Sequence, residues 1–473
     1  MIATELRAGD ELDGYRIEAR LHAGGMAVIY GVSRADLPGP AVMKVPRLGH
    51  GEPGATIVSF EVEQMMLGIA GGGPVPTLYA QGDMAVAPYL VMEHVEGVVL
   101  SAEAEQLPWS IERLTVVGVA VAEAVHALHQ RDIIHLDLKP SNIIMRPDGS
   151  AVLIDLGLAH HAQMPDLLAE EIRRPLGSAP YISPEQVLGV RSEPRSDIFA
   201  LGVMLYEFAT GKLPFGSPTG ITGMRKRLRM QPMPPRAYRT DLPPYLQEII
   251  LRCLEVDPSR RYTTASQLAF DLQHPEKVVL SERSRTTRRS GAWRRFRHWI
   301  FGLGFDPVGV LTPRMAVSQA PIVQVFVDTS HTSERRQDAL RNEAARMARA
   351  LPEARLAFVA VAREQPAMGQ SDDARSGPRE HLRMLVELRH WAESVNVEPA
   401  RTTCHVLESN DSVEAVLDYA RVNQVDTLLI CAPNTYLSGS RILPSVAEKI
   451  ILHAPCTVVV ARAPQVTRAA ETA

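Results

Sequence analysis

The stretch that decides the fold of this chain is His135-Leu136-Asp137-Leu138-Lys139-Pro140-Ser141-Asn142. It sets a carboxylate, a cation and an amide close together in the chain. Two short apolar runs follow, at 143–145 and 151–154, and the Asp148-Gly149 pair between them predicts a hairpin. Because a hairpin returns the chain to its starting point, we expect Asn142 and Asp155 to lie close enough to bind one metal ion.

This stretch resembles the catalytic loop of the protein kinase family. The resemblance implies that Asp137 is the catalytic base and that Lys139 holds the γ-phosphate during transfer. It also implies that Asn142 and Asp155, the latter in an Asp155-Leu156-Gly157 motif, bind the metal. The implied cofactors are ATP and Mg²⁺, with Mn²⁺ as an alternative metal.

The resemblance continues upstream. Ala41-Val42-Met43-Lys44 is similar to the kinase strand that carries the phosphate-binding lysine, so Lys44 is expected to act in both ATP binding and catalysis. The next helical stretch begins near residue 59 and carries two acidic candidates for the partner of Lys44. We expect Glu63 to be that partner, and Glu61 is the runner-up.

The segment Tyr89–Val95 is similar to the hinge that binds adenine in kinases. The resemblance makes Met92 the gatekeeper and sets the backbone from Glu93 to Val95 against the adenine ring. Such a hinge predicts that adenine is recognised through backbone groups.

Further matches lie downstream. Ser183-Pro184-Glu185 resembles the APE motif of kinases, with Arg261 as the partner of Glu185 and Asp197 as the αF aspartate. Lys139 and the Gly177-Ser178 pair are similar to the serine/threonine class rather than the tyrosine class. The resemblance covers residues 15–272 and implies Ser or Thr hydroxyls of proteins, including the chain itself, as substrates.

The glycine-rich loop, Leu21-His22-Ala23-Gly24-Gly25-Met26-Ala27, is the weakest match to the family. His22 stands where the first glycine normally lies, and Ala27 stands at the third. A bulkier first position restricts the approach of the backbone to phosphate, so we expect weakened but retained ATP binding. The nucleotide-binding residues implied for this part of the chain are Leu21, Gly24, Gly25 and Ile29.

A second departure concerns activation. Leu136 replaces the family's arginine, which pairs with a phosphorylated activation loop through charge-assisted hydrogen bonds. Between Asp155 and Gly177 the chain has no Ser, Thr or Tyr. We therefore predict that phosphorylation inside this segment does not switch the enzyme on. The charged stretch 170–174 either orders the segment through fixed contacts or forms a solvated face.

The composition is ordinary for a globular protein. The 473 residues are 45% hydrophobic and 22% charged with a net charge of −4, which predicts more than one domain and no general affinity for nucleic acid. The four cysteines form no CxxC pair, so the pattern favours neither a zinc site nor a disulfide framework. Neither a secretory signal nor a run of the ~20 apolar residues needed to span a bilayer is found, and we expect a cytoplasmic protein.

The pattern of apolar residues divides the chain. Residues 1–272 predict an α+β bilobal kinase fold, with a strand-rich lobe at 15–95 and a helical lobe at 96–272. Residues 320–462 alternate β-rich and helical stretches, which is typical of an α/β doubly wound parallel sheet. A basic, aromatic linker at 273–319 joins the two domains, and a flexible tail at 463–473 ends the chain.

The second domain resembles the universal stress protein family in its opening, Val325–Ser330, and its close, Ser445–Val460. Asp328 ends the first strand and is either a ligand-site residue or a helix cap. Nucleotide-binding members carry a glycine pattern near the end, whereas this chain has Cys431, Asn434 and Pro444 there and keeps only Ser445. We therefore expect a regulatory or dimerising module that does not bind ATP in the ordinary way.

The linker interleaves cations with aromatic rings between Trp293 and Phe301. This pattern favours packing against a neighbouring domain; the alternative is peripheral contact of residues 293–305 with an anionic membrane. Candidate autophosphorylation sites in the linker are Ser281, Ser284, Thr286, Thr287 and Ser290.

The sequence thus predicts a protein serine/threonine kinase with a C-terminal regulatory domain. Two alternatives stay open: a non-catalytic kinase-like scaffold, and a nucleotide or stress sensor whose output comes from residues 320–462.

Overall fold

The computed structural model describes residues 6–47, 54–83, 87–103, 106–162, 164, 166, 168, 175, 177–287, 321–328, 334–352, 354–363, 377–397, 401–423, 425–432 and 446–462. Three segments named above lie outside the described residues: the charged stretch 170–174, the aromatic part of the linker, and the tail.

The first domain opens with an antiparallel sheet. Its strands lie in the order β1-β2-β3-β4-β6-β5. They are β1 (Glu11–Leu12), β2 (Tyr15–Ala23), β3 (Ala27–Ser33), β4 (Ala41–Pro46), β5 (Leu78–Gln81) and β6 (Leu90–Glu93). Tyr15, Ile17 and Met43 meet in one core of this lobe, because alternate residues of a strand point to the same face.

Helix α1 (Gly54–Ala70) connects this sheet with the second lobe. Phe60 and Met66 of α1 are buried in the same hydrophobic cluster as Leu90 and Met92 of β6. That cluster continues into the helical lobe, so α1 contributes to both lobes.

The second lobe is mainly helical. Its helices are α2 (Leu100–Glu103), α3 (Ile111–His129), α5 (Pro184–Val187), α6 (Arg195–Thr210), α7 (Ile221–Met224), α8 (Pro244–Cys253), α9 (Ala265–Gln273) and α10 (Glu282–Arg285). Short strands carry the functional loops: β7 (Val98–Val99), β8 (Ile133–Ile134), β9 (Ile143–Met145), β10 (Ala151–Leu153) and β11 (His160–His161). Local chemistry sets helix ends: the Ser110 side chain accepts a hydrogen bond from the backbone N–H of Arg113 at the start of α3, and Gly211 (φ 67°) ends α6.

The last described residues before the gap at 288 pack on the first domain. The Gln247 side chain of α8 donates to the backbone oxygens of Arg283, Ser284 and Thr286, at 2.6, 3.3 and 2.9 Å. Ser284 is fully buried, and the Ser281 hydroxyl donates to the Glu248 carboxylate at 2.7 Å. The hydroxyls of both serines are therefore engaged in hydrogen bonds within the first domain.

The second domain has a parallel sheet in the order β14-β13-β12-β15-β16. The strands are β12 (Ile322–Phe326), β13 (Arg355–Ala362), β14 (Thr402–Glu408), β15 (Thr427–Cys431) and β16 (Thr457–Ala461). The helices are α13 (Glu334–Ala350), α14 (Gly377–Glu393), α15 (Ser412–Val422) and α16 (Val446–His453). One core packs against α13 and α14, and others pack against α15 and α16, so helices cover both faces of the sheet.

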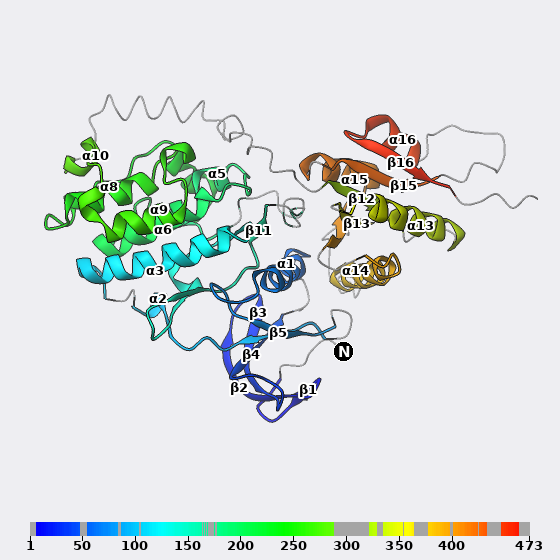
Figure 1. The fold of residues 1–473 in the computed structure, drawn as a ribbon, viewed down its shortest axis with the longest axis horizontal. Helices are drawn as coiled ribbons and strands as arrows, with labels where there is room; N and C mark the ends of the chain where they lie inside the picture. Colours follow the sequence, from blue (N-terminus) through cyan, green and yellow to red (C-terminus); the bar gives the residue numbers. More distant parts are fainter. Residues whose placement is uncertain are drawn as a thin grey trace, which may run out of the picture.

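Figure 1 shows the two lobes of the first domain and the separate second domain, with α14 on the side that faces α1. The expected α+β bilobal fold and the expected doubly wound parallel sheet are both confirmed.

Candidate active site

The catalytic loop is held by hydrogen bonds to Asp197 at the start of α6. The carboxylate of Asp197 accepts hydrogen bonds from the backbone N–H groups of His135 and Leu136, both at 2.9 Å, and contacts Nε2 of His129 at 2.8 Å. Burial opposes ionisation of Asp197, but these hydrogen bonds hold its pKa below the ordinary value. Leu136 takes a left-handed conformation (φ 62°), which turns the chain toward Asp137.

Asp137 is 7% exposed and is held from three sides. One oxygen accepts from the backbone N–H of Ser178 at 2.7 Å, and the other accepts from Nζ of Lys139 at 2.7 Å and from Nδ2 of Asn142 at 3.2 Å. A carboxylate offers about four acceptor positions, so one remains for another hydrogen-bond donor.

The predicted hairpin β9/β10 is present, with Ile143 paired to Leu153. The backbone N–H of Ile154 donates to the backbone oxygen of Asn142 at 2.9 Å, which brings Asn142 beside the residue before Asp155. The amide nitrogen of Asn142 is engaged by Asp137, which leaves its carbonyl oxygen to face a cation. Carboxylate and amide oxygens are donors that Mg²⁺ accepts, so this pair fits a divalent metal.

Lys44 of β4 forms the predicted pair with Glu63 of α1. Its Nζ lies 2.5 Å from the Glu63 carboxylate and 3.1 Å from the Asp155 carboxylate. Burial favours the neutral amine, but the two carboxylates outweigh it and raise the pKa of Lys44. The runner-up, Glu61, pairs with Arg389 of the second domain at 3.3 Å.

Helix α1 also touches the motif that follows β10. The Ser59 hydroxyl donates to the backbone oxygen of Gly157 at 2.9 Å, and a Cβ at Gly157 would lie 2.4 Å from that hydroxyl. Leu156 is fully buried. The position of α1 is therefore coupled to the backbone of the Asp155-Leu156-Gly157 motif, a contact that no local pattern in the sequence indicated.

The glycine-rich loop closes the hairpin between β2 and β3. The backbone N–H of Gly24 donates to Ala27 at 2.9 Å, and Arg47 donates to the backbone oxygen of Gly24 at 3.2 Å. His22 faces Ile29 across the strands, and a Cβ at Gly24 would lie 3.6 Å from the His22 ring. Gly25 has open space around it. Leu21 is half-exposed nearby, so the predicted nucleotide-binding positions fall on one hairpin.

The predicted hinge follows β6. Met92 is buried and pairs with Val42 of β4. The Glu93 carboxylate accepts from Arg146 at 2.5 Å and from the Thr77 hydroxyl at 3.3 Å. Its side chain is thereby held by these neighbours, and Val95 is buried two residues further along.

The activation segment is anchored by residues that the sequence did not single out. Nε of Arg191 lies 2.6 Å from the Asp166 carboxylate, and Gln186 donates to the backbone oxygen of Leu136 at 2.8 Å. Burial disfavours the charge of Asp166, but Arg191 lowers its pKa. Only the tertiary fold joins the members of each pair, since Asp166 and Arg191 are 25 positions apart and Leu136 and Gln186 are 50 apart.

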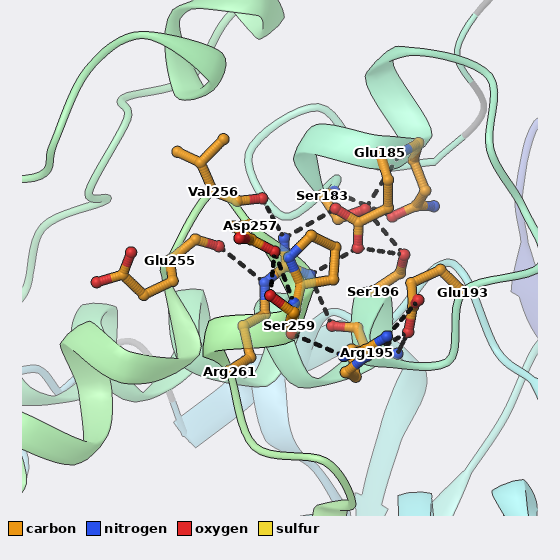
Figure 2. Close-up of polar contacts among 12 residues, drawn as sticks. Ser183, Glu185, Glu193, Arg195, Ser196, Glu255, Val256, Asp257, Ser259 and Arg261 are labelled. Carbon is orange, nitrogen blue, oxygen red and sulfur yellow. Dashed lines mark hydrogen bonds and ion pairs between the residues drawn. The ribbon is translucent and has the colours of Figure 1, made fainter. Parts of the chain in front are cut away.

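Figure 2 shows the buried pair that fixes the end of the activation segment. Arg261 contacts both oxygens of Glu185, at 2.6 and 2.8 Å, and the Ser196 hydroxyl donates to Glu185 at 2.7 Å. Both members of the pair are fully buried. This confirms the predicted partnership, and loss of one member of such a pair costs about 3–5 kcal/mol.

The second domain has a small pocket at the ends of β12 and β15. Its described walls enclose about 180 Å³ and include Asp328, Arg336, Gln337 and Cys431. Asn434, Pro444 and Ser445, which stand where nucleotide-binding members carry their glycine pattern, lie outside the described residues.

Among the described residues, the longest helices carry too little apolar sequence to cross a bilayer.

Comparisons with known proteins match both parts of the chain. A family model described as "Protein kinase domain" matches residues 75–274, and one described as "Universal stress protein family" matches residues 323–462.

Three bacterial relatives match the first domain. A probable serine/threonine-protein kinase of Clostridium acetobutylicum is 29% identical over 58% of this chain and 42% of its own length. Another, of Clostridium perfringens, is 34% identical over 41% of this chain and 29% of its own length. Serine/threonine-protein kinase PknL of Mycobacterium tuberculosis is 29% identical over 62% of this chain and 75% of its own length.

The chain thus spans less than half the length of the first two relatives. It combines a protein kinase domain with a C-terminal domain of the universal stress protein family.

Proposed function

We propose that the chain is a serine/threonine protein kinase that transfers the γ-phosphoryl group of ATP to Ser or Thr hydroxyls of proteins, itself included. The observation that carries the proposal is the state of Asp137. Its carboxylate is fixed by Lys139, Asn142 and the N–H of Ser178 while Lys44 is paired with Glu63. A non-catalytic scaffold has no need to keep this arrangement.

In the proposed mechanism, Asp137 orients the substrate hydroxyl and takes its proton. A base of this kind acts over hydrogen-bond distance, so its carboxylate has to be held still. The hydrogen bonds from Ser178 and Asn142 provide that restraint. Lys139, whose Nζ lies 2.7 Å from the Asp137 carboxylate, would hold the γ-phosphate beside the attacking oxygen.

On the other side of the site, Lys44 would bind the phosphates of ATP, and Glu63 would keep the lysine in position. Asn142 and Asp155 would hold the metal through their side-chain oxygens. A bound Mg²⁺ or Mn²⁺ ion would neutralise charge on the phosphates. Leu21, Gly24, Gly25 and Ile29 would cover the nucleotide, and the hinge at Met92, Glu93 and Val95 would receive adenine.

The proposal includes activity without phosphorylation of the activation segment. Leu136 cannot pair with a phosphate, and the Asp166–Arg191 pair and the Gln186–Leu136 hydrogen bond supply fixed contacts in its place. Neither the Asp166–Arg191 ion pair nor the Gln186–Leu136 hydrogen bond depends on phosphorylation, so the segment needs no added phosphate to be held.

The test is transfer of radiolabelled phosphate from MgATP to the protein and to a generic basic protein, comparing the full chain with Asp137→Asn. We expect label in the wild type and a loss of about 100-fold or more in the variant. No label in either protein, with the circular dichroism of both unchanged, would favour the scaffold.

We further propose that the second domain can pair two copies of the chain. The support is β16, an edge strand whose residues Val458, Val459 and Val460 are half-buried. Such an edge offers unpaired backbone groups to a second strand. Size-exclusion chromatography with light scattering of the full chain should give the mass of a dimer. The mass of a monomer at micromolar concentration would reject the dimer proposal.

We also propose domain boundaries, a cellular location and a membrane contact for the chain. The domain boundaries at 272, 320 and 462 agree with the bounds of the sheets and helices, except that the hydrogen bonds of residues 281–286 to α8 support a later start of the linker. The proposal of a cytoplasmic location is supported by the four free cysteines, because thiols stay reduced in the cytosol.

The proposed membrane contact of residues 293–305 predicts that the full chain cosediments with vesicles rich in phosphatidylserine but not with neutral vesicles.

A further inference from the structure

The outer side of α1 is in contact with the second domain. Nη2 of Arg389 on α14 lies 3.3 Å from the Glu61 carboxylate, and the Glu61 side chain is only 7% exposed. Figure 1 shows α14 beside α1, and residues of the two helices are in contact.

A second contact reaches the activation segment. The backbone N–H of Asp166 donates to Oδ1 of Asn423, at the end of α15, at 2.8 Å. The side chain of the same Asp166 is the partner of Arg191. The second domain therefore binds the residue that anchors the segment.

A third interaction is electrostatic and lies near the catalytic loop. Arg355, at the start of β13, disfavours the charged form of the His161 ring, and Asp132 favours the charge of Arg355. His161 pairs with Ile133 in the two-stranded ladder directly before the catalytic loop. The charges are complementary, since Glu61 and Asp132 on the kinase side meet Arg389 and Arg355 on the other.

All three contacts fall on elements whose position decides the state of a kinase. Helix α1 carries Glu63, the activation segment supplies the Ser178 N–H to Asp137, and β8 leads into the catalytic loop. Between Asp155 and Gly177 the segment has no Ser, Thr or Tyr, and Leu136 lacks a charge to receive a phosphate. The contacts with the second domain therefore add to the order that the Asp166–Arg191 pair gives the segment.

We propose that the outer face of α1, together with Asp166 and His161, is a docking surface for the chain's own stress-like domain, and that docking holds α1 where Lys44 and Glu63 pair. The proposal rests on the proposed kinase function and names its regulation. Because a bound domain stabilises the conformation that it binds, release of the domain shifts α1 away from Lys44 and lowers the rate of transfer.

The test uses the full chain with Arg389→Glu, which sets like charges against each other at Glu61. The matched control is Arg383→Glu on the same helix, since Arg383 is exposed and pairs only weakly with Glu387 at 3.4 Å. Two quantities are measured: deuterium uptake of peptides from residues 54–70 without ATP, and the rate of phosphate transfer. Allosteric couplings are usually about 5–150-fold, and we expect a fall in rate of about fivefold.

Support consists of faster exchange in α1 and slower transfer in Arg389→Glu alone, with both restored by the charge swap Glu61→Lys/Arg389→Glu. Restoration excludes simple misfolding of the variant. Exchange in α1 that is equal in Arg389→Glu, Arg383→Glu and wild type overturns the proposal. Deuterium exchange is measured without ATP and does not depend on catalysis. If the wild type transfers no phosphate but α1 still exchanges faster in Arg389→Glu, the kinase function is rejected and the docking proposal stands.

Discussion

The inner and outer faces of α1 carry glutamates two positions apart that serve different parts of the molecule. Glu63 contacts Lys44 inside the site at 2.5 Å, whereas Glu61 contacts Arg389 of the second domain at 3.3 Å. Residues two apart on a helix point in nearly opposite directions, so one helix can respond to two partners. The comparison teaches that α1 is a shared element, with catalysis on one face and interdomain contact on the other.

The largest effect should come from breaking the inner face. Glu63→Gln leaves Asp155 as the carboxylate partner of the buried Lys44. Because loss of one partner of a buried ion pair is strongly destabilising, we expect the transfer rate to fall about 100-fold. Glu61→Gln removes only the outer pair and should lower the rate about fivefold. Initial rates of radiolabel transfer at saturating ATP measure both, and equal losses in the two variants would contradict the division between the faces.

A smaller effect is expected where α1 meets Gly157. Gly157→Ala places a Cβ 2.4 Å from the Ser59 hydroxyl, and overpacking of this kind costs about 1–3 kcal/mol. We expect a fall in transfer rate of about tenfold because α1 has to move. Adding Ser59→Ala removes the clashing oxygen and should restore part of the rate. A double variant as slow as the single one would show that Gly157 acts by other means.

The pKa of His161 reports on the outer contacts. Burial and the nearby Arg355 lower this pKa to about 4. Because the folded state disfavours the charged ring, His161 contributes stability that is fully present above its ordinary value of 6.5 and is lost as the pH falls toward 4.

Arg355→Gln should raise the pKa of His161, since one of its two main causes is removed. The exposed Arg363, changed to Gln, is the control. An NMR titration of the full chain with labelled histidine side chains measures the shift. An unchanged pKa in Arg355→Gln would mean that Arg355 and His161 are apart in solution.

The smallest effect is expected from a change that touches neither face of α1. His22→Gly restores the missing glycine at the first position of the loop and should lower the KM for ATP about threefold, with kcat unchanged. Steady-state kinetics separate the two constants. A changed kcat would indicate that the loop acts on the chemical step as well as on nucleotide binding.

Much of the site followed from the sequence because its residues lie in short ordered segments. Asp137, Lys139 and Asn142 are held within one loop, and the hairpin that follows brings Asp155 back to them. The preference for Glu63 over Glu61 also agreed with the structure. Local geometry suffices in such cases, since a turn or a helical repeat sets the distance between residues a few positions apart.

The sequence by itself determined the two domain types, the order of their strands and helices, and the residues that meet inside the active site. Only the tertiary structure decided that Glu61 pairs with Arg389, that Asp166 contacts Arg191 and Asn423, and that Ser59 contacts Gly157. These partners lie 328, 25, 257 and 98 positions apart, respectively. Contacts across such separations depend on how whole elements pack, and no local periodicity records that packing.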